Sequence, residues 1–203
     1  MQKSSLVNNT YTIAVDIGSP KKGHFGWADT NNKTGDKVES FLEAIKERTY
    51  FSLGIEAPLF IPLIGNVEEF TNRRLFDDKH PWSAGAGACT AAITLGFLAR
   101  VFSLFVDKGI SVTTDINIWK KYTDNCILIW EAFITGSSQD TKHKSLHIDD
   151  ARIALKNYCN QNKEFVKLLD LQEYLPTPLA IALQLGIKSS NGTKSGLVIK
   201  GGK

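Results

Sequence analysis

Two kinds of hydrophobic spacing alternate along the chain, and together they predict strands that alternate with helices. Short apolar runs bounded by turn residues are typical of buried strands. Such runs occupy residues 10–16, 50–58, 110–114 and 126–133. Apolar residues at helical spacing predict helices at 37–48, 68–76, 83–109, 145–159 and 175–185.

This alternation favours an α/β fold in which helices flank one β-sheet. The segment "GSPKK" turns the chain after the first strand, and "HFGWAD" at 24–29 returns beside it as an antiparallel partner. The sheet is therefore expected to be mixed. We expect a single domain over residues 1–203, with a core at about 10–188, a loop at 58–66 and a flexible tail at 189–203.

Composition narrows the class of protein without choosing a function. The 203 residues are 42% hydrophobic and 22% charged, which is typical of soluble globular domains. The formal net charge of +3 permits a nucleic-acid partner without requiring one. Polar residues interrupt the longest apolar stretch, at 91–106, so we expect no membrane span. The oligomeric state stays open, a homodimer included.

The three cysteines indicate a compartment. Cys89, Cys126 and Cys159 form no CxxC pair, so neither a disulfide framework nor a zinc ribbon is indicated. Their apolar surroundings predict buried free thiols, which fit a reducing environment. We therefore expect a cytoplasmic protein.

Two acidic residues stand at the ends of otherwise apolar strands. Asp16 follows "TIAV" and Glu56 follows "FSLGI". Carboxylates are seldom buried unless a partner compensates their charge. If the two strands lie side by side in parallel, both acids share the edge at which α/β sheets bind ligands. Two carboxylates at so short a distance either raise the pKa of one of them or recruit a cation such as Mg²⁺, which prefers oxygen ligands.

The helix "SLHIDDARIALKNYC" offers a third acid. Successive helical residues advance by about 100°, so with His147 at zero Asp150 falls at about 300°, beside the apolar stripe. Asp149 falls at about 200°, on the same face as Arg152. The spacing therefore favours Asp150, together with His147, for a site between helix and sheet.

The segments "VDIG", "GIEAP" and "HIDDARIAL" resemble the ribonuclease H-like superfamily. The helix segment is similar to the His-x-x-Asp-Ala pattern of RuvC-type Holliday-junction resolvases. The layout also resembles an uncharacterised family of predicted nucleases with that fold, over about residues 10–158. The resemblance implies a ribonuclease H-like mixed sheet and a nuclease that hydrolyses phosphodiester bonds in DNA or RNA.

The same resemblance implies a catalytic set made of Asp16, Glu56, His147 and Asp150. The three acids would hold one or two Mg²⁺ or Mn²⁺ ions, which activate the attacking water and stabilise the leaving oxygen. His147 would bind a metal or move a proton, because an unperturbed histidine has a pKa of about 6.5.

Other residues are candidates for contact with the substrate. Arg73, Arg74 and Trp82 precede a helix whose start is rich in Gly and Ala, and helix N-termini and arginines bind phosphate. Lys21 lies in the turn after the first strand. Glu131 leaves the apolar run "CILIW" and is a candidate either for substrate contact or for support of the site.

Each feature also has a structural interpretation. Asp16 could accept backbone N–H bonds from the turn that follows it. Glu56 could pair with Arg73 or Arg74. His143 and His147 have a spacing that zinc sites use, but no cysteine accompanies them.

Two further functions stay open. The segment "DIGS" with Lys21 and Lys22 is similar to the first phosphate loop of ATP-binding proteins of the actin and sugar-kinase class. A non-catalytic binding module on the same scaffold is the other alternative, because a fold does not fix a function.

Overall fold

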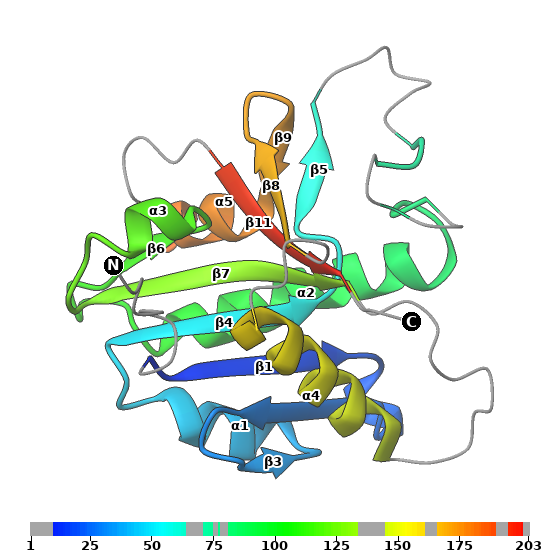
Figure 1. Ribbon diagram of the computed structural model, residues 1–203, viewed down its shortest axis with the longest axis horizontal. Coiled ribbons are helices and arrows are strands. Elements are labelled where there is room, and N and C mark those ends of the chain that lie inside the picture. The colour runs from blue at the N-terminus through cyan, green and yellow to red at the C-terminus, as the bar shows by residue number, and fades with distance from the viewer. Residues whose placement is uncertain are drawn as a thin grey trace.

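A mixed β-sheet with helices on both faces forms the frame of the molecule (Figure 1). The computed structural model describes residues 10–63, 71–74, 77, 81–133, 145–160, 166–189 and 195–200. Within these residues the main path of the sheet runs β10–β6–β7–β4–β1–β2–β3. Its strands are β1 (Thr12–Ile17), β2 (Phe25–Asp29), β3 (Thr34–Gly35), β4 (Tyr50–Glu56), β6 (Ser111–Thr113), β7 (Cys126–Phe133) and β10 (Lys188–Ser189).

Strand β1 sets the topology of the sheet. It pairs antiparallel with β2 across the predicted turn and parallel with β4, which in turn pairs parallel with β7. Apolar side chains in these strands are buried on both faces, as expected for strands covered by helices on either side. The predicted α/β fold with a mixed sheet is confirmed.

Two hydrophobic layers hold the helices against the sheet. The helices are α1 (Val38–Ile45), α2 (Gly85–Ser103), α3 (Ile116–Trp119), α4 (Ser145–Asn160) and α5 (Thr177–Gln184). On one face α1, α2 and α5 contribute Phe41, Leu98 and Ala182 to the larger core cluster. On the other face α3 and α4 contribute Trp119 and Tyr158 to a second cluster. Figure 1 shows α4 in front of the sheet and α2 behind it.

The C-terminal segment differs from the prediction of a flexible tail. Residues 195–200 form β11 (Ser195–Lys200), which pairs parallel with β7 and antiparallel with β8 (Val166–Asp170). Leu197, Val198 and Ile199 are buried in this strand. The short run "GLVI" does not stand out among its Gly, Ser and Lys neighbours, and pairing with a distant strand decides its structure.

The segment predicted as a loop at 58–66 also contains a strand. β5 (Phe60–Pro62) pairs antiparallel with β9 (Tyr174–Pro176) in a separate two-stranded sheet. The partner is distant in sequence, so the local pattern does not reveal it. The polar segment "GSSQDTKHK" at 136–144, whose composition predicts a loop, lies outside the described residues. Parts of the helix predicted at 68–76 lie outside them too, and the described residues 71–74 are not helical.

Helix α2 is the longest of the described helices. By length and composition it could cross a membrane: the mean hydropathy of its 18-residue window is 1.5, and 28% of that window is buried. The core helix of a soluble protein meets the same criteria, so the expected absence of a membrane span stays a prediction. Cys89 is exposed on α2 and Cys159 is half-buried, so the prediction that all three free cysteines are buried holds for Cys126 alone.

Candidate metal centre

The first two acids of the predicted site lie side by side. Asp16 is next to last in β1 and Glu56 is last in β4, and the two residues are direct partners in the parallel ladder. Partners in adjacent strands project to the same face of a sheet. Asp16 is 7% exposed, so its carboxylate is largely withdrawn from water. The register therefore brings two carboxylates together at one edge of the sheet.

Helix α4 brings the third acid because Gly26 lets it approach. Gly26 is the antiparallel partner of Asp16, and a Cβ atom at this position would lie 2.3 Å from the backbone carbonyl carbon of His147. Any larger residue would push the start of α4 away from β2. The local sequence does not distinguish Gly26 from other glycines, although a glycine inside a strand often marks close approach of another backbone.

Asp16, Glu56 and Asp150 form an acidic cluster, named here the acid triad. One oxygen from each lies within 4.8 Å of the others. The predicted proximity of these three residues is confirmed. Like charges at this spacing favour the uptake of a cation or of a proton.

The donor set of the triad fits a hard divalent ion. All three side chains offer carboxylate oxygens, which Mg²⁺ and Mn²⁺ prefer over the nitrogen and sulfur ligands typical of zinc. Two oxygens bound to one Mg²⁺ at about 2.1 Å are at most about 4.2 Å apart. The spacing of the triad, within 4.8 Å, is therefore close to what a single ion requires.

His147 contacts the triad through Asp16. Its Nδ1 atom shares a hydrogen bond with Asp16 Oδ2, and this bond raises the pKa of His147, although partial burial acts in the opposite direction. Asp150 adds to the rise. The exposed ring of His24 stacks on His147 with 5.3 Å between ring centroids. A histidine bonded to one oxygen of a carboxylate fixes the orientation of that carboxylate.

The other acid of the helix points away, as its angle predicted. Asp149 is exposed and accepts a hydrogen bond of 2.8 Å from Arg152. The two neighbouring aspartates of α4 thus have different environments, and only Asp150 belongs to the acid triad.

The turn between β1 and β2 places Lys21 beside this site. Its 3₁₀ helix (Pro20–Lys22) begins at a proline and ends at Gly23 with a φ of 76°. His24, which stacks on His147, follows at once. Lys21 and Lys22 are exposed, so the turn that links Asp16 to His24 carries two solvent-facing cations.

Arg74, predicted as a substrate contact, is paired with Glu131, predicted either as a substrate contact or as support for the site. The guanidinium donates to Glu131 Oε1 at 2.7 Å and to Asp77 Oδ1 at 2.8 Å, and the paired side chains are fully buried. Burial raises the pKa of the Glu131 carboxyl, and Arg74 opposes that rise. We name Arg74, Asp77 and Glu131 the Arg74 clamp. Arg74 and Glu131 cannot reach a substrate without breaking this pairing, which corrects the prediction that they contact the substrate.

Arg73 and Trp82 are placed less decisively. Arg73 is exposed. Trp82 is half-buried before α2, and its backbone N–H donates to Asp77 Oδ2 at 3.1 Å. The roles of both residues in substrate binding stay predictions.

The fold and the site define the class of molecule: an α/β protein with a mixed sheet whose edge carries a carboxylate triad. Comparisons of the chain with protein-family models, with curated proteins and with solved structures gave no match.

Proposed function

We propose that this protein is a metal-dependent nuclease of ribonuclease H-like fold that hydrolyses phosphodiester bonds in DNA or RNA. The observation that carries the proposal is the acid triad, in which β1, β4 and α4 each contribute one carboxylate within 4.8 Å. The hairpin that opens the sheet and the late helix that returns to β1 and β2 support the ribonuclease H-like interpretation.

The residues of the site have separate roles in the proposed reaction. Asp16, Glu56 and Asp150 would hold one or two Mg²⁺ or Mn²⁺ ions, which generate a nucleophilic water and stabilise charge on the leaving oxygen. His147 holds one oxygen of Asp16 and so orients the carboxylate. Lys21 and Lys22 offer cations to the phosphates on either side of the scissile bond.

Metal binding is the first test. Mn²⁺ at 100 times its dissociation constant should stabilise the wild-type protein by about 2.7 kcal/mol, measured as a shift of thermal unfolding. Asp16→Asn and Asp150→Asn should abolish this shift, because each removes a charged ligand. Asp149→Asn is the matched control on the same helix and should keep it. If the Asp149 and Asp150 variants respond alike, the triad is not a metal site.

Substrate binding and cleavage form the second test. Single-stranded and duplex DNA and RNA should be cut in the presence of Mn²⁺, and not by Asp16→Asn. The double change Lys21→Ala, Lys22→Ala should weaken binding and lower the slope of log K against log[salt] by about one per lost phosphate contact. Lys120→Ala with Lys121→Ala changes another exposed lysine pair, at the opposite end of the sheet, and should leave both quantities unchanged.

Two outcomes would favour the alternatives. Stabilisation by ATP–Mg²⁺ without any nucleic-acid cleavage would favour the ATP-binding class. Nucleic-acid binding without turnover, at any metal concentration, would favour a binding module.

A further inference from the structure

The backbone around Glu56 lies where regular sheet pairing stops on one side. Glu56 is the last residue of β4, and the β4–β7 ladder ends one pair earlier, at Ile55 and Glu131. On its β1 side Glu56 still pairs with Asp16. Beyond Ile55, contacts other than the ladder must fix the chain on the β7 side.

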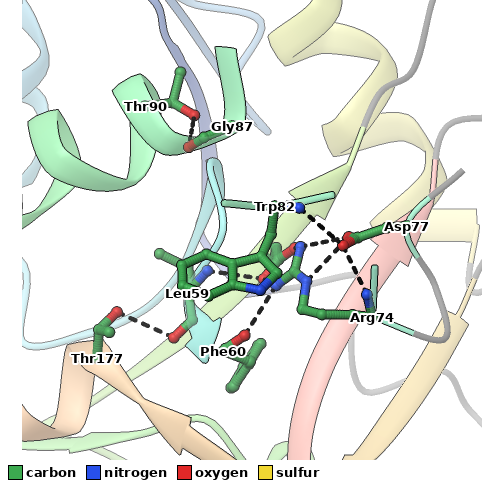
Figure 2. Close-up of polar contacts among 9 residues, drawn as sticks. Leu59, Phe60, Arg74, Asp77, Trp82, Gly87, Thr90 and Thr177 are labelled. Carbon is green, nitrogen blue, oxygen red and sulfur yellow. Dashed lines mark hydrogen bonds and ion pairs between the residues drawn. The ribbon is translucent and has the colours of Figure 1, made fainter. Parts of the chain in front are cut away.

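The Arg74 clamp supplies such contacts three residues after Glu56 (Figure 2). The Leu59 N–H donates to Glu131 Oε2 at 2.8 Å, and Arg74 Nη1 donates to the carbonyl oxygen of Phe60 at 3.1 Å. The carbonyl oxygen of Leu59 accepts bonds of 2.9 and 3.0 Å from the backbone N–H and the hydroxyl of Thr177. Leu59 and Phe60 are also completely buried. The segment is thus held by its polar groups and by packing.

The clamp itself has little freedom. The guanidinium of Arg74 makes five hydrogen bonds, two to Asp77 Oδ1, two to Glu131 and one to Phe60, which uses its full set of donors. Asp77 Oδ2 accepts the Arg74 N–H at 2.9 Å. Bidentate bonds of this kind add geometric specificity because any displacement lengthens several bonds at once.

The connection from Leu59 back to Glu56 is short and restrained. Only Ala57 and Pro58 intervene, and the Ala57 N–H bonds the carbonyl oxygen of Ile55 at 2.9 Å. The proline ring fixes its own φ and restricts the residue before it. A shift of Leu59 is therefore passed to Glu56 and not absorbed between them.

We propose that the Arg74 clamp positions Glu56 in the acid triad, so that Glu131 and Arg74 are positioning residues on the opposite face of the sheet. The inference rests on the proposed metal site for its effect on binding. Its structural content, the place of Glu56 beside Asp16, stands independently of the metal.

The test changes residues that form or support the Arg74 clamp and measures Mn²⁺ binding by the acid triad. Glu131→Gln keeps the size of the side chain and removes the negative charge that pairs with Arg74. The Mn²⁺ dissociation constant, measured by titration calorimetry on the full chain, should rise about tenfold, as when the outer partners of metal ligands are changed. Thr177→Val removes one donor to Leu59 without leaving a buried charge, and should give a smaller rise in the same direction.

A stability-matched variant separates positioning from general loosening. Ile45→Val or Ile45→Ala, whichever matches the melting temperature of Glu131→Gln, perturbs the same core from α1 and should leave the Mn²⁺ dissociation constant unchanged. Equal effects of the Ile45 and Glu131 variants, or no effect of the Glu131 and Thr177 variants, would overturn the proposal.

A metal-free crystal structure of Glu131→Gln provides a readout that does not depend on the metal. We expect the Glu56 carboxylate to move away from Asp16. If the wild-type protein binds no Mn²⁺, the proposed function fails, and this structure alone decides the inference. An unmoved Glu56 would then refute it.

Discussion

Two carboxylate clusters lie on opposite faces of one sheet, and their local sequences do not indicate that they face opposite sides. Glu56 ends "FSLGIE" and Glu131 stands in "CILIWE", so each is an acid after an apolar strand. In the parallel ladder Glu131 pairs with Ile55, the residue before Glu56. Because successive side chains alternate between faces, this offset of one residue sends the two glutamates to opposite sides.

The clusters also differ in what lies at their centre. In the Arg74 clamp a guanidinium lies between Glu131 and Asp77, within 2.7 to 3.0 Å of their oxygens. In the acid triad three carboxylates approach one another, and a histidine holds one of them from the side. Acids that gather at a strand end therefore do not identify a metal site until the counter-charge has been located.

Removal of the guanidinium should have the largest effect on stability. Arg74→Met leaves Glu131 and Asp77 buried without their cation, and loss of one partner from a buried ion pair costs about 3–5 kcal/mol. The free energy of unfolding in urea measures this loss. Arg152→Met is the control, because its pair with Asp149 is exposed and contributes only about 0–1 kcal/mol. Equal losses for the two variants would show that the clamp is no more important than a surface pair.

A methyl group at Gly26 should disturb the triad and spare the clamp. Gly26→Ala forces α4 away from β2, which we expect to abolish Mn²⁺ binding and to cost about 1–3 kcal/mol as overpacking does. Gly96→Ala is the matched control: apart from the adjoining backbone of α2, no heavy atom lies within 4 Å of a Cβ there, and the change stabilises the helix by up to about 1 kcal/mol. Calorimetric titration with Mn²⁺ checks both. Retained affinity in Gly26→Ala would mean that α4 does not need this close approach.

The sequence was sufficient for the elements with strong local signals. The hairpin, the parallel strands β4 and β7 and the helix α4 have apolar patterns of sufficient length, and the helical angle alone separates Asp150 from Asp149. Strands β5, β8 and β11 went unrecognised because their pairing partners are distant in the chain.

The errors at the site have the same physical origin. Arg74 looked like a surface cation because nothing near it in sequence shows that Glu131, 57 residues away, is its partner. The role of Gly26 is not evident from its neighbours in sequence, because it depends on helix α4, which begins far along the chain. Both cases depend on long-range contacts, which residue type and local spacing do not encode.

Titration of His147 should give the smallest effect and should distinguish the two clusters by pH. The hydrogen bond that His147 donates to the Asp16 carboxylate raises the pKa of His147 in the folded protein above its unfolded value of about 6.5. The resulting stabilisation is fully present below that unfolded pKa and is lost as pH rises through the folded pKa. The guanidinium of Arg74 stays charged throughout this range, so the clamp supplies no matching change on its cationic side.

Urea unfolding of metal-free protein, with EDTA present, should show the free energy of unfolding of the wild type falling with rising pH relative to that of His147→Gln. His24, Asp16 and Asp150 are retained in both proteins, so the difference between the two profiles reports the loss of the His147 side chain. If the two pH profiles are parallel, the bond between His147 and Asp16 does not stabilise the metal-free triad.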